Sequence, residues 1–329
     1  MTTRLLWVAA AVAALALAGV ASVAFGARIV GPSDVLHGLA GAHDTIGEAA
    51  VAKRIPRTLL AMLVGAALGV AGAVMQGVTR NPIADPGILG ITSGASLAVV
   101  TGIAFFSMSS PTSYLWVAIA GAALAAAFVY AIGSLGRGGA TPLKLALAGA
   151  ASAAAFSSLI SAVLLPRVDI IDTYWHWQIG GVGGATYGRI GQVLPFLLLG
   201  AIVCLAAARG LNALALGDDV AAGLGERVAM TRLLSFVGAV VLCGAATAVA
   251  GPIAFVGLVV PHVCRLLIGI DHRWLLPFTA LVGATLLTAA DVLGRVVARP
   301  EEIDVGIITA LIGAPFFISI VRRQKVRAL

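Results

Sequence analysis

This chain of 329 residues is too apolar for a soluble protein, because 60% of its residues are hydrophobic and only 11% are charged. Its 40 glycines favour helices that pack closely in lipid. The composition therefore predicts an all-α polytopic membrane protein in which residues 1–329 form one transmembrane domain. The net charge of +7 does not call for nucleic acid as a partner, because an uneven distribution of Lys and Arg across a bilayer explains it. Cys204, Cys243 and Cys264 lie in apolar stretches without metal-ligand spacing, so we expect neither a metal site nor a cofactor.

Ten apolar runs come close to the ~20 residues that a membrane-spanning helix needs. They cover residues 5–27, 56–78, 88–108, 114–134, 143–165, 191–208, 232–250, 252–269, 274–291 and 303–321. The first run resembles a signal peptide, but its apolar core is too long, which favours a retained span. Between the first two runs, residues 28–53 are expected to form a polar connection.

Basic residues are unevenly distributed between the two sides that ten spans create. One side carries Arg4, Arg80, Arg137 and the C-terminal Arg322, Arg323, Lys325 and Arg327. The other side carries most of the acidic residues. Because Lys and Arg accumulate in cytoplasmic loops, we expect the first side, with both termini, to be cytoplasmic.

The longest polar interruption on the expected cytoplasmic side is the segment at about 211–231. It contains a narrow apolar stripe of residues that recur every fourth position, namely Leu216, Val220, Leu224 and Val228. Gly217 and Asp218 suit the start of a short helix. Gly223 and Gly225 predict a break in that helix, with a positive φ at Gly223 that a side chain would oppose. Such a stripe fits either a groove on another protein or the headgroup layer of the membrane.

The sequence lacks residues that would let the chain energise transport by itself. Ionisable residues lie at the ends of the apolar runs, whereas ion-coupled carriers usually place carboxylates or histidines near the middle of the membrane. The nucleotide-binding pattern GxxxxGK[ST] does not occur. The energy source is therefore expected to be another polypeptide. A secondary carrier or channel that works without an ATPase is the alternative.

Two arginines at the expected outer end of the second run lie against the usual charge distribution. Arg54 and Arg57 are three residues apart and share one helix face. An anionic partner outside the membrane would explain them, and a lipid phosphate or a nearby acidic side chain is the alternative. Later in the same run, Gly65 and Gly69 form a GxxxG face that lets a neighbouring helix approach closely.

Four blocks of the sequence carry a family resemblance: RIPRTLLAMLVGAALGVAGAVMQGVTRNPIADPGILGI, LALGDDVAAGLG, VAGPIAFVGLVVPHVCRLLIG and VGIITALIGAPFFISIVRR. In this order they closely resemble the permease family of bacterial iron–siderophore, haem and vitamin B12 ABC importers. The resemblance implies a type II ABC importer permease with ten transmembrane helices in the bacterial inner (cell) membrane. It implies a transport subunit without catalytic chemistry, whose cargo is an iron chelate such as a ferric siderophore, with haem or cobalamin as alternatives.

The resemblance also implies partners and residue roles. The partners are a second permease, identical or paralogous, two ATP-binding cassette ATPases and an extracytoplasmic substrate-binding protein. Docking points for the binding protein are implied at Arg54, Arg57 and Arg295. Contacts with the ATPase are implied at Leu216, Gly217, Asp218, Val220, Gly223, Leu224 and Gly225. A cytoplasmic gate is implied at Asn81, Pro82, Ile83, Thr141, Pro142 and Leu143, although the sequence TPLK departs from the polar residues often found at the second position.

Overall fold

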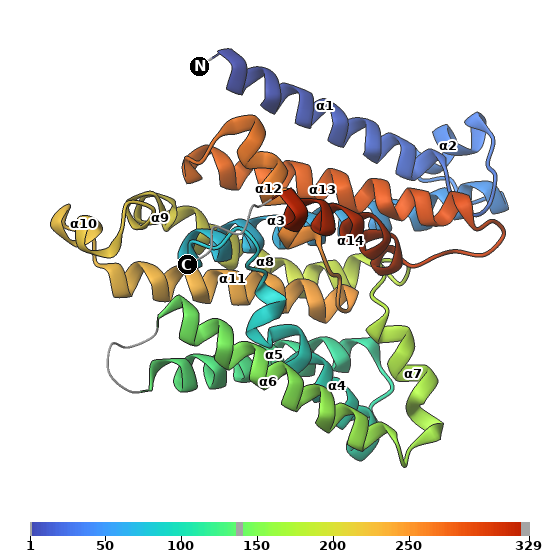
Figure 1. Cartoon of the computed structure of the whole chain (residues 1–329). Coiled ribbons are helices and arrows are strands. Elements are labelled where there is room, and N and C mark those ends of the chain that lie inside the picture. Colours follow the sequence, from blue (N-terminus) through green and yellow to red (C-terminus); the bar gives the residue numbers. More distant parts are fainter. Residues whose placement is uncertain (1, 136–140, 324–329) are drawn as a thin grey trace.

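The computed structural model describes residues 2–135 and 141–323, and the elements in these ranges are helices (Figure 1). In chain order they are α1 (Thr2–Ala24), α2 (Pro32–Leu39), α3 (Ile46–Thr79), the 3-10 helix η1 (Pro86–Leu89), α4 (Ile91–Phe106), α5 (Pro111–Ser134), α6 (Pro142–Leu164), α7 (Val168–Gln178), α8 (Tyr187–Ala206), α9 (Ala208–Leu214), α10 (Asp218–Gly223), α11 (Val228–Ala250), α12 (Val256–Ile268), α13 (His272–Val297) and α14 (Val305–Arg323). Arg137, Lys325 and Arg327, which were assigned to the expected cytoplasmic side, lie outside the described residues.

Each of the ten predicted spans corresponds to a helix, which confirms the all-α membrane fold. Within the described ranges, α1, α3, α5, α6, α8, α11 and α13 are long and apolar enough to cross a membrane, and α4, α12 and α14 are shorter apolar helices. The remaining helices α2, α7, α9 and α10 are short segments in the connections.

Helix α3 starts earlier than the sequence suggested. Thr45 and Glu48 form a capping box: the Thr45 hydroxyl accepts from the Glu48 N–H at 3.1 Å, and the Glu48 carboxylate accepts from the Thr45 N–H at 3.1 Å. The polar connection predicted at residues 28–53 therefore includes α2 and the first eight residues of α3. At 1.5 Å per residue, α3 is about 51 Å long, well beyond the thickness of a bilayer core.

Glycines let α3 lie at the centre of the bundle in close contact with two other helices. A β-carbon at Gly65 would collide with the carbonyl of Gly283 in α13, and one at Gly72 would collide with the carbonyl of Gly257 in α12. The close helix approach predicted for the Gly65–Gly69 face is thus confirmed. Because neighbouring backbones touch here, these positions exclude any larger residue.

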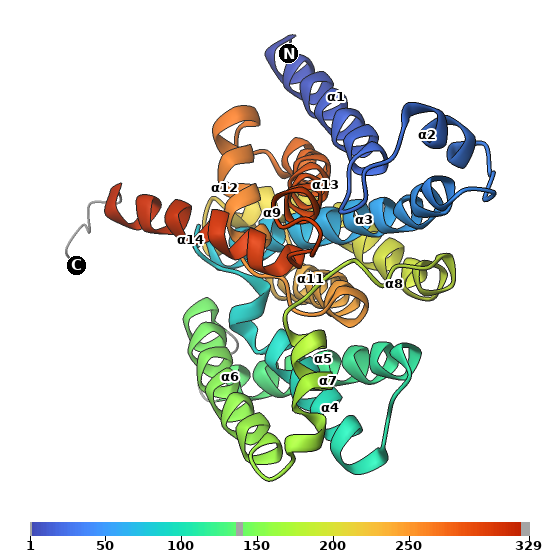
Figure 2. The ribbon, with the colours of Figure 1, turned by 90° about the vertical axis from the view of Figure 1, so that its right-hand side faces the viewer.

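The other helices are arranged around α3 in two unequal groups (Figure 2). Helices α4, α5, α6 and α7 form a group on one side, next to α11. Helix α1 lies at the opposite edge, where only 11% of its most apolar stretch is buried, against 78% for α3. Most of the surface of α1 therefore lies outside the bundle.

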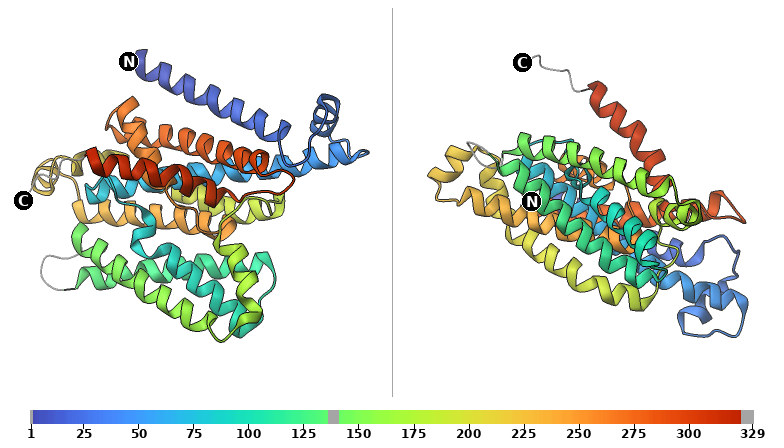
Figure 3. Two further views of the ribbon diagram at one scale, coloured as in Figure 1. Left: turned by 45° about the vertical axis from the view of Figure 1, so that its right-hand side comes forward. Right: turned by 90° about the horizontal axis from the view of Figure 1, so that it is seen from below.

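The short helices mark the two ends of the bundle. Helices α9 and α10 lie at one end and α2 and α7 at the other, in every view that separates them (Figures 1 and 3). We name these the α9–α10 end and the α2–α7 end. Helix α3 runs from the α2–α7 end to the α9–α10 end, and α13 runs in the opposite direction.

Candidate functional site

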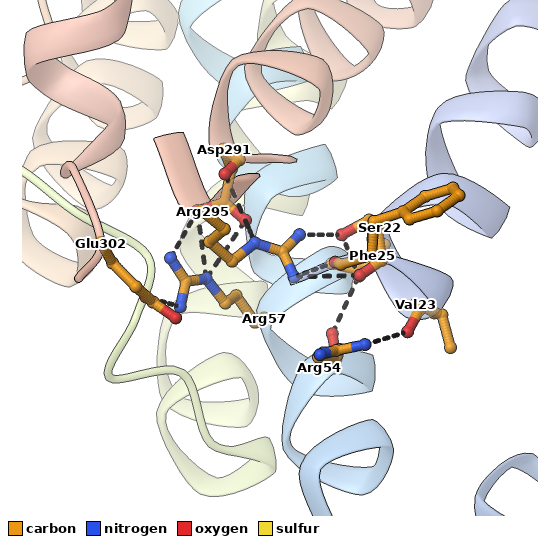
Figure 4. A network of polar contacts seen from close by, with 9 residues as sticks. Ser22, Val23, Phe25, Arg54, Arg57, Asp291, Arg295 and Glu302 are labelled. Atoms are coloured by element: carbon orange, nitrogen blue, oxygen red, sulfur yellow. Dashed lines mark hydrogen bonds and ion pairs between the residues drawn. The ribbon is translucent and has the colours of Figure 1, made fainter. Parts of the chain in front are cut away.

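The three arginines expected to dock a binding protein lie together at the α2–α7 end (Figure 4). Arg54 and Arg57 come from the first half of α3, and Arg295 comes from the end of the antiparallel α13. Their exposed fractions are 6%, 9% and 1%, respectively. The sequence correctly grouped these side chains, but it did not indicate that they would be buried.

Two carboxylates of the same chain form ion pairs with two of these three arginines. Arg57 donates to the fully buried Asp291 through Nε at 3.1 Å and Nη2 at 2.8 Å, and to Glu302 through Nη1 at 2.5 Å. The Arg295 Nε lies 3.0 Å from the other oxygen of Asp291. Asp291 is thus shared by two guanidinium groups, an arrangement that offsets the cost of burying all three charges. It is the nearby acidic partner that the sequence left open as an alternative.

The remaining donors of the cluster bind the C-terminal turn of α1. Arg54 donates to the carbonyls of Val23 at 3.0 Å and Ala24 at 2.9 Å, and Arg295 donates to the Ser22 carbonyl at 3.0 Å. The last carbonyls of a helix have no partner within it and carry its negative dipole end, so guanidinium groups suit them. The two arginines therefore cap α1 and attach it to the bundle.

Glu302 is the member of the cluster most open to solvent. Its side chain is 41% exposed, against 11% for Arg57 and 1% for Asp291. Asp304 follows in the same connection before α14, where burial raises the pKa of its carboxyl and Arg57 acts in the opposite direction. An anion approaching this end would therefore meet Glu302 before it met Arg57.

Sequence reasoning missed the acidic and α1 residues of the cluster. One signal was present, since Asp291 and Arg295 are four residues apart and share a helix face. No local signal connects Asp291 with Arg57 or Ser22 with Arg295, because these pairs are separated by 234 and 273 positions.

At the opposite end, the predicted ATPase-contact segment presents an exposed apolar surface. Leu216, Val220 and Leu224 are 62%, 51% and 67% exposed. Val228, the fourth member of the predicted stripe, is instead the first residue of α11 and packs against the core. The exposed stripe therefore consists of three side chains on and beside α10, and it offers a small apolar contact surface.

The glycines that bound α10 differ in part from the prediction. Positive φ angles occur at Gly217 (112°) and Gly225 (83°), so these two residues carry the turns. Gly223 ends α10 without a positive φ, and a β-carbon there would meet no other atom within 4 Å. The expected positive φ at Gly223 is therefore wrong, whereas the break predicted at Gly225 is confirmed.

Asp218 links this segment to the spanning helices. As the first residue of α10, it forms ion pairs with Arg80 at the end of α3 and with Arg232 in α11, the latter at 2.7 Å. The negative charge also suits a helix N-terminus. The ion pairs of Asp218 thus connect α10 to two helices, while the three side chains of its apolar stripe remain more than half exposed.

The two predicted gate turns lie at the same end as α10. The Asn81 side-chain oxygen accepts from the Ile83 N–H at 3.1 Å and forms a tight turn after α3, with Pro82 exposed between them. Thr141 caps α6 by accepting from the Lys144 N–H at 3.4 Å, Pro142 is the first residue of that helix, and Leu143 is 70% exposed. Both turns lie directly at helix ends.

Comparison with known proteins agrees with this architecture. The model of the FecCD transport family matches residues 14–323. The chain belongs to this family. It is therefore a transport protein of the membrane rather than a catalytic enzyme. Among the FecCD relatives, the ferric enterobactin transport system permease protein FepD of Escherichia coli (strain K12) is 43% identical over 98% of this chain and 96% of its own length.

Other comparisons extend this picture. The probable siderophore transport system permease protein YfiZ of Bacillus subtilis (strain 168) is 41% identical over 82% of this chain and 81% of its own length. Further relatives are named as permeases for iron(3+)-hydroxamate, Fe(3+)-citrate and hemin, at 43%, 45% and 39% identity. A solved structure described as an inward-facing metal-chelate type ABC transporter matches with a TM-score of 0.83 and 29% identity, over 97% of this chain and 99% of that one.

Proposed function

We propose that this chain is the membrane permease subunit of an ATP-driven importer of iron chelates, with residues 1–329 forming one transmembrane domain. The observation that carries the proposal is the exposed stripe of Leu216, Val220 and Leu224 on a segment held rigidly by Asp218. A short helix with apolar anchors is suited to a groove on another protein. In a FecCD transport protein, the partner that fits is a separate ATPase subunit.

The cargo that we propose is a ferric siderophore, with haem or cobalamin as alternatives. Relatives at 39–45% identity are named for enterobactin, hydroxamate, citrate or hemin, and in each of these ligands the iron is held by an organic chelator. A shielded metal makes few demands on the protein, whereas a bare hard cation needs several oxygen ligands. Selection among the chelates would fall to the binding protein.

The remaining partners are a second permease, either a copy of this chain or a paralogue, two ATPase subunits and an extracytoplasmic binding protein. The surface that supports pairing with another permease is formed by α6 and α14. Leu147 and Leu159 of α6 are 63% and 52% exposed, and Leu311 of α14 is 65% exposed. A groove on α14 lined by Ile307, Ala310 and Pro315 continues this surface. We infer that the transport path runs between the two permeases.

The orientation follows from the proposed partners. The α9–α10 end would face the cytoplasm, because the proposed ATPases would bind α10 from that side. Both termini would lie on the same side. The turns Asn81–Ile83 and Thr141–Leu143 would form the cytoplasmic gate at that end. Transport would then be a two-state exchange between outward and inward openings, driven by closure of the ATPases on α10.

We also propose that Arg54, Arg57 and Arg295 serve the docking of the binding protein. Their grouping at the α2–α7 end supports this, as does the partly exposed carboxylate of Glu302 on Arg57. An acidic residue of the binding protein could replace Glu302 on the Arg57 guanidinium without stripping the buried Asp291 from it. Docking would thus exchange Glu302 on Arg57 for a carboxylate of the binding protein. Such a contact determines the orientation of the docked binding protein more than its affinity.

Uptake by reconstituted proteoliposomes tests the proposed function. Vesicles that contain the permease, its ATPase and its binding protein should import ferric enterobactin, ferric hydroxamate, ferric citrate or hemin only with ATP, and vanadate should stop the import. Vesicles without the permease are the control. Import that continues without the ATPase would instead establish a secondary carrier, and import of free ferric ion would contradict the chelate cargo.

A further inference from the structure

The ionisable side chains that line a cavity at the α9–α10 end are all basic. It has a volume of about 260 Å³ and lies between the end of α3, the end of α12 and the start of α13. Its ionisable lining consists of Arg80, Arg265 and His272, and among the described residues no carboxylate contributes to its wall. A cavity of this kind attracts anions, because basic side chains focus positive potential in a confined space.

Arg265 is held in position without an acidic partner. It is half-buried, and its Nη1 donates to the Gln76 Oε1 at 2.6 Å. The Gln76 amide is itself fixed, because its Nε2 donates to the carbonyls of Gly257 at 3.2 Å and Leu258 at 3.3 Å. Within the part of the chain that the structure describes, Arg265 forms no ion pair. A partly buried guanidinium with unused donors is costly, and an anion would offset that cost.

Arg80 supplies a second guanidinium to the same cavity. It is an exposed residue at the end of α3, where its φ of 50° turns the chain. Its ion-pair partner Asp218 is shared with Arg232. Asp218 would therefore keep a cationic partner if Arg80 rotated towards an anion in the cavity. Arginine suits this role because its planar fork can bind two oxygens of a phosphate at once.

Exposed aliphatic side chains beside the cavity indicate the source of the anion. Leu266 and Ile270 are 76% and 73% exposed, and Ile270 also lines the cavity. They follow Arg265 in sequence, so an apolar surface adjoins the basic one. This combination matches a molecule with a phosphate at one end and hydrocarbon at the other, since basic pockets between spanning helices bind anionic lipid headgroups.

We propose that the cavity between α3, α12 and α13 binds the phosphate headgroup of an acidic phospholipid, through Arg80 and Arg265. This site shares Pro82 with the cytoplasmic gate proposed above, but the argument for it does not rest on the transport function. Its occupant would lie directly beside the Arg80–Asp218 contact that positions α10.

Native mass spectrometry of the full-length protein, titrated with phosphatidylglycerol and separately with phosphatidylcholine, tests this proposal. The wild type should bind phosphatidylglycerol more tightly. Arg80→Gln and Arg265→Gln should each weaken that binding about tenfold, since each removes one charge-assisted set of hydrogen bonds. Arg209→Gln, which alters an exposed arginine of α9 outside the cavity, is the matched control and should bind like the wild type.

The outcomes separate the sources of the phosphate. Equal affinity for the two lipids, or unchanged binding in both cavity variants, would overturn the proposal. If the wild type bound inorganic phosphate at millimolar concentration, Arg265→Gln did not, and neither lipid was preferred, the site would take free phosphate rather than lipid and the lipid proposal would be overturned. If Arg265→Gln did not fold, two other variants would decide the question. Arg80→Gln changes an exposed residue, and Arg265→Lys keeps the partly buried charge.

Discussion

The candidate functional side chains at the two ends of this bundle differ in how far they are buried. At the α2–α7 end, charged groups are buried and paired with one another and with α1, so the cluster is complete within the chain. At the α9–α10 end, the apolar side chains of Leu216, Val220 and Leu224 are more than half exposed. Changes at the first end should therefore affect the stability of the fold, whereas changes at the second should affect assembly and leave the fold intact.

The largest effect should follow from Asp291→Asn. This change leaves the guanidinium groups of Arg57 and Arg295 buried without their shared carboxylate. Breaking a buried ion pair from one side costs about 3–5 kcal/mol, so the thermal midpoint of the purified protein in detergent should fall sharply. Glu302→Gln is the matched control, because its side chain is 41% exposed and should cost much less. Equal midpoints for Asp291→Asn and wild type would show that the cluster does not stabilise the fold.

Leu224→Asp should abolish assembly without affecting the fold. A charge placed in a desolvated groove costs several kcal/mol, so the ATPase should no longer co-purify. Ala222→Asp introduces the same charge on another exposed face of α10 and should retain the ATPase. Both variants should keep the thermal midpoint of the wild type, since Leu224 is 67% exposed. Co-purification of the ATPase with Leu224→Asp at wild-type levels would mean that the stripe lies on the membrane surface instead.

Arg54→Gln should release the end of α1. The change removes hydrogen bonds to the carbonyls of Val23, Ala24 and Arg28, each worth about 1 kcal/mol or more when the donor is charged. Hydrogen exchange should then accelerate in the last turn of α1 and remain unchanged in α11. Arg28→Gln is the control, because Arg28 contributes only its carbonyl and its side chain is exposed. Equal exchange in both variants would refute the capping role of Arg54.

The smallest effect concerns docking. If Arg57 receives a carboxylate of the binding protein, Glu302 competes for the same guanidinium, and Glu302→Gln should strengthen docking about two- to fivefold. The gain should shrink at high salt, because exposed charges are screened. The equilibrium constant for the binding protein at two salt concentrations measures this. Weaker docking by Glu302→Gln would mean that Glu302 itself belongs to the docking surface. This variant is preferable to charge reversal at Arg57, which would disrupt a buried pair.

Periodic and local signals in the sequence were sufficient for much of the fold. Among the described residues, the apolar runs predicted the seven helices that are long enough to cross a membrane and the three shorter apolar helices, because hydropathy over about 20 residues determines what can cross a bilayer. The close approach at Gly65 followed from the GxxxG spacing. The early start of α3 was missed, although Thr45 and Glu48 have the spacing of a capping box and could have indicated it.

The site was predicted less completely, because its energetics depend on contacts between distant segments. The sequence analysis placed Arg54, Arg57 and Arg295 in one site. The burial of these arginines against Asp291 and the end of α1 depends on helix packing, which it could not predict. At α10, the apolar stripe could be recognised locally, and so could the turn at Gly225. The positive φ expected at Gly223 occurs at Gly217 instead. A glycine in sequence permits a positive φ without requiring one.

The unbroken course of α3 has a mechanical consequence. One rigid rod carries Arg57 in the charged cluster and ends at Arg80, which holds the first residue of α10. These two arginines are about 35 Å apart along the helix axis, and no break lies between them to absorb a displacement. A displacement of α3 along its axis at the cluster would therefore also move the residue that holds α10. One continuous helix thus connects the charged cluster with the α10 segment.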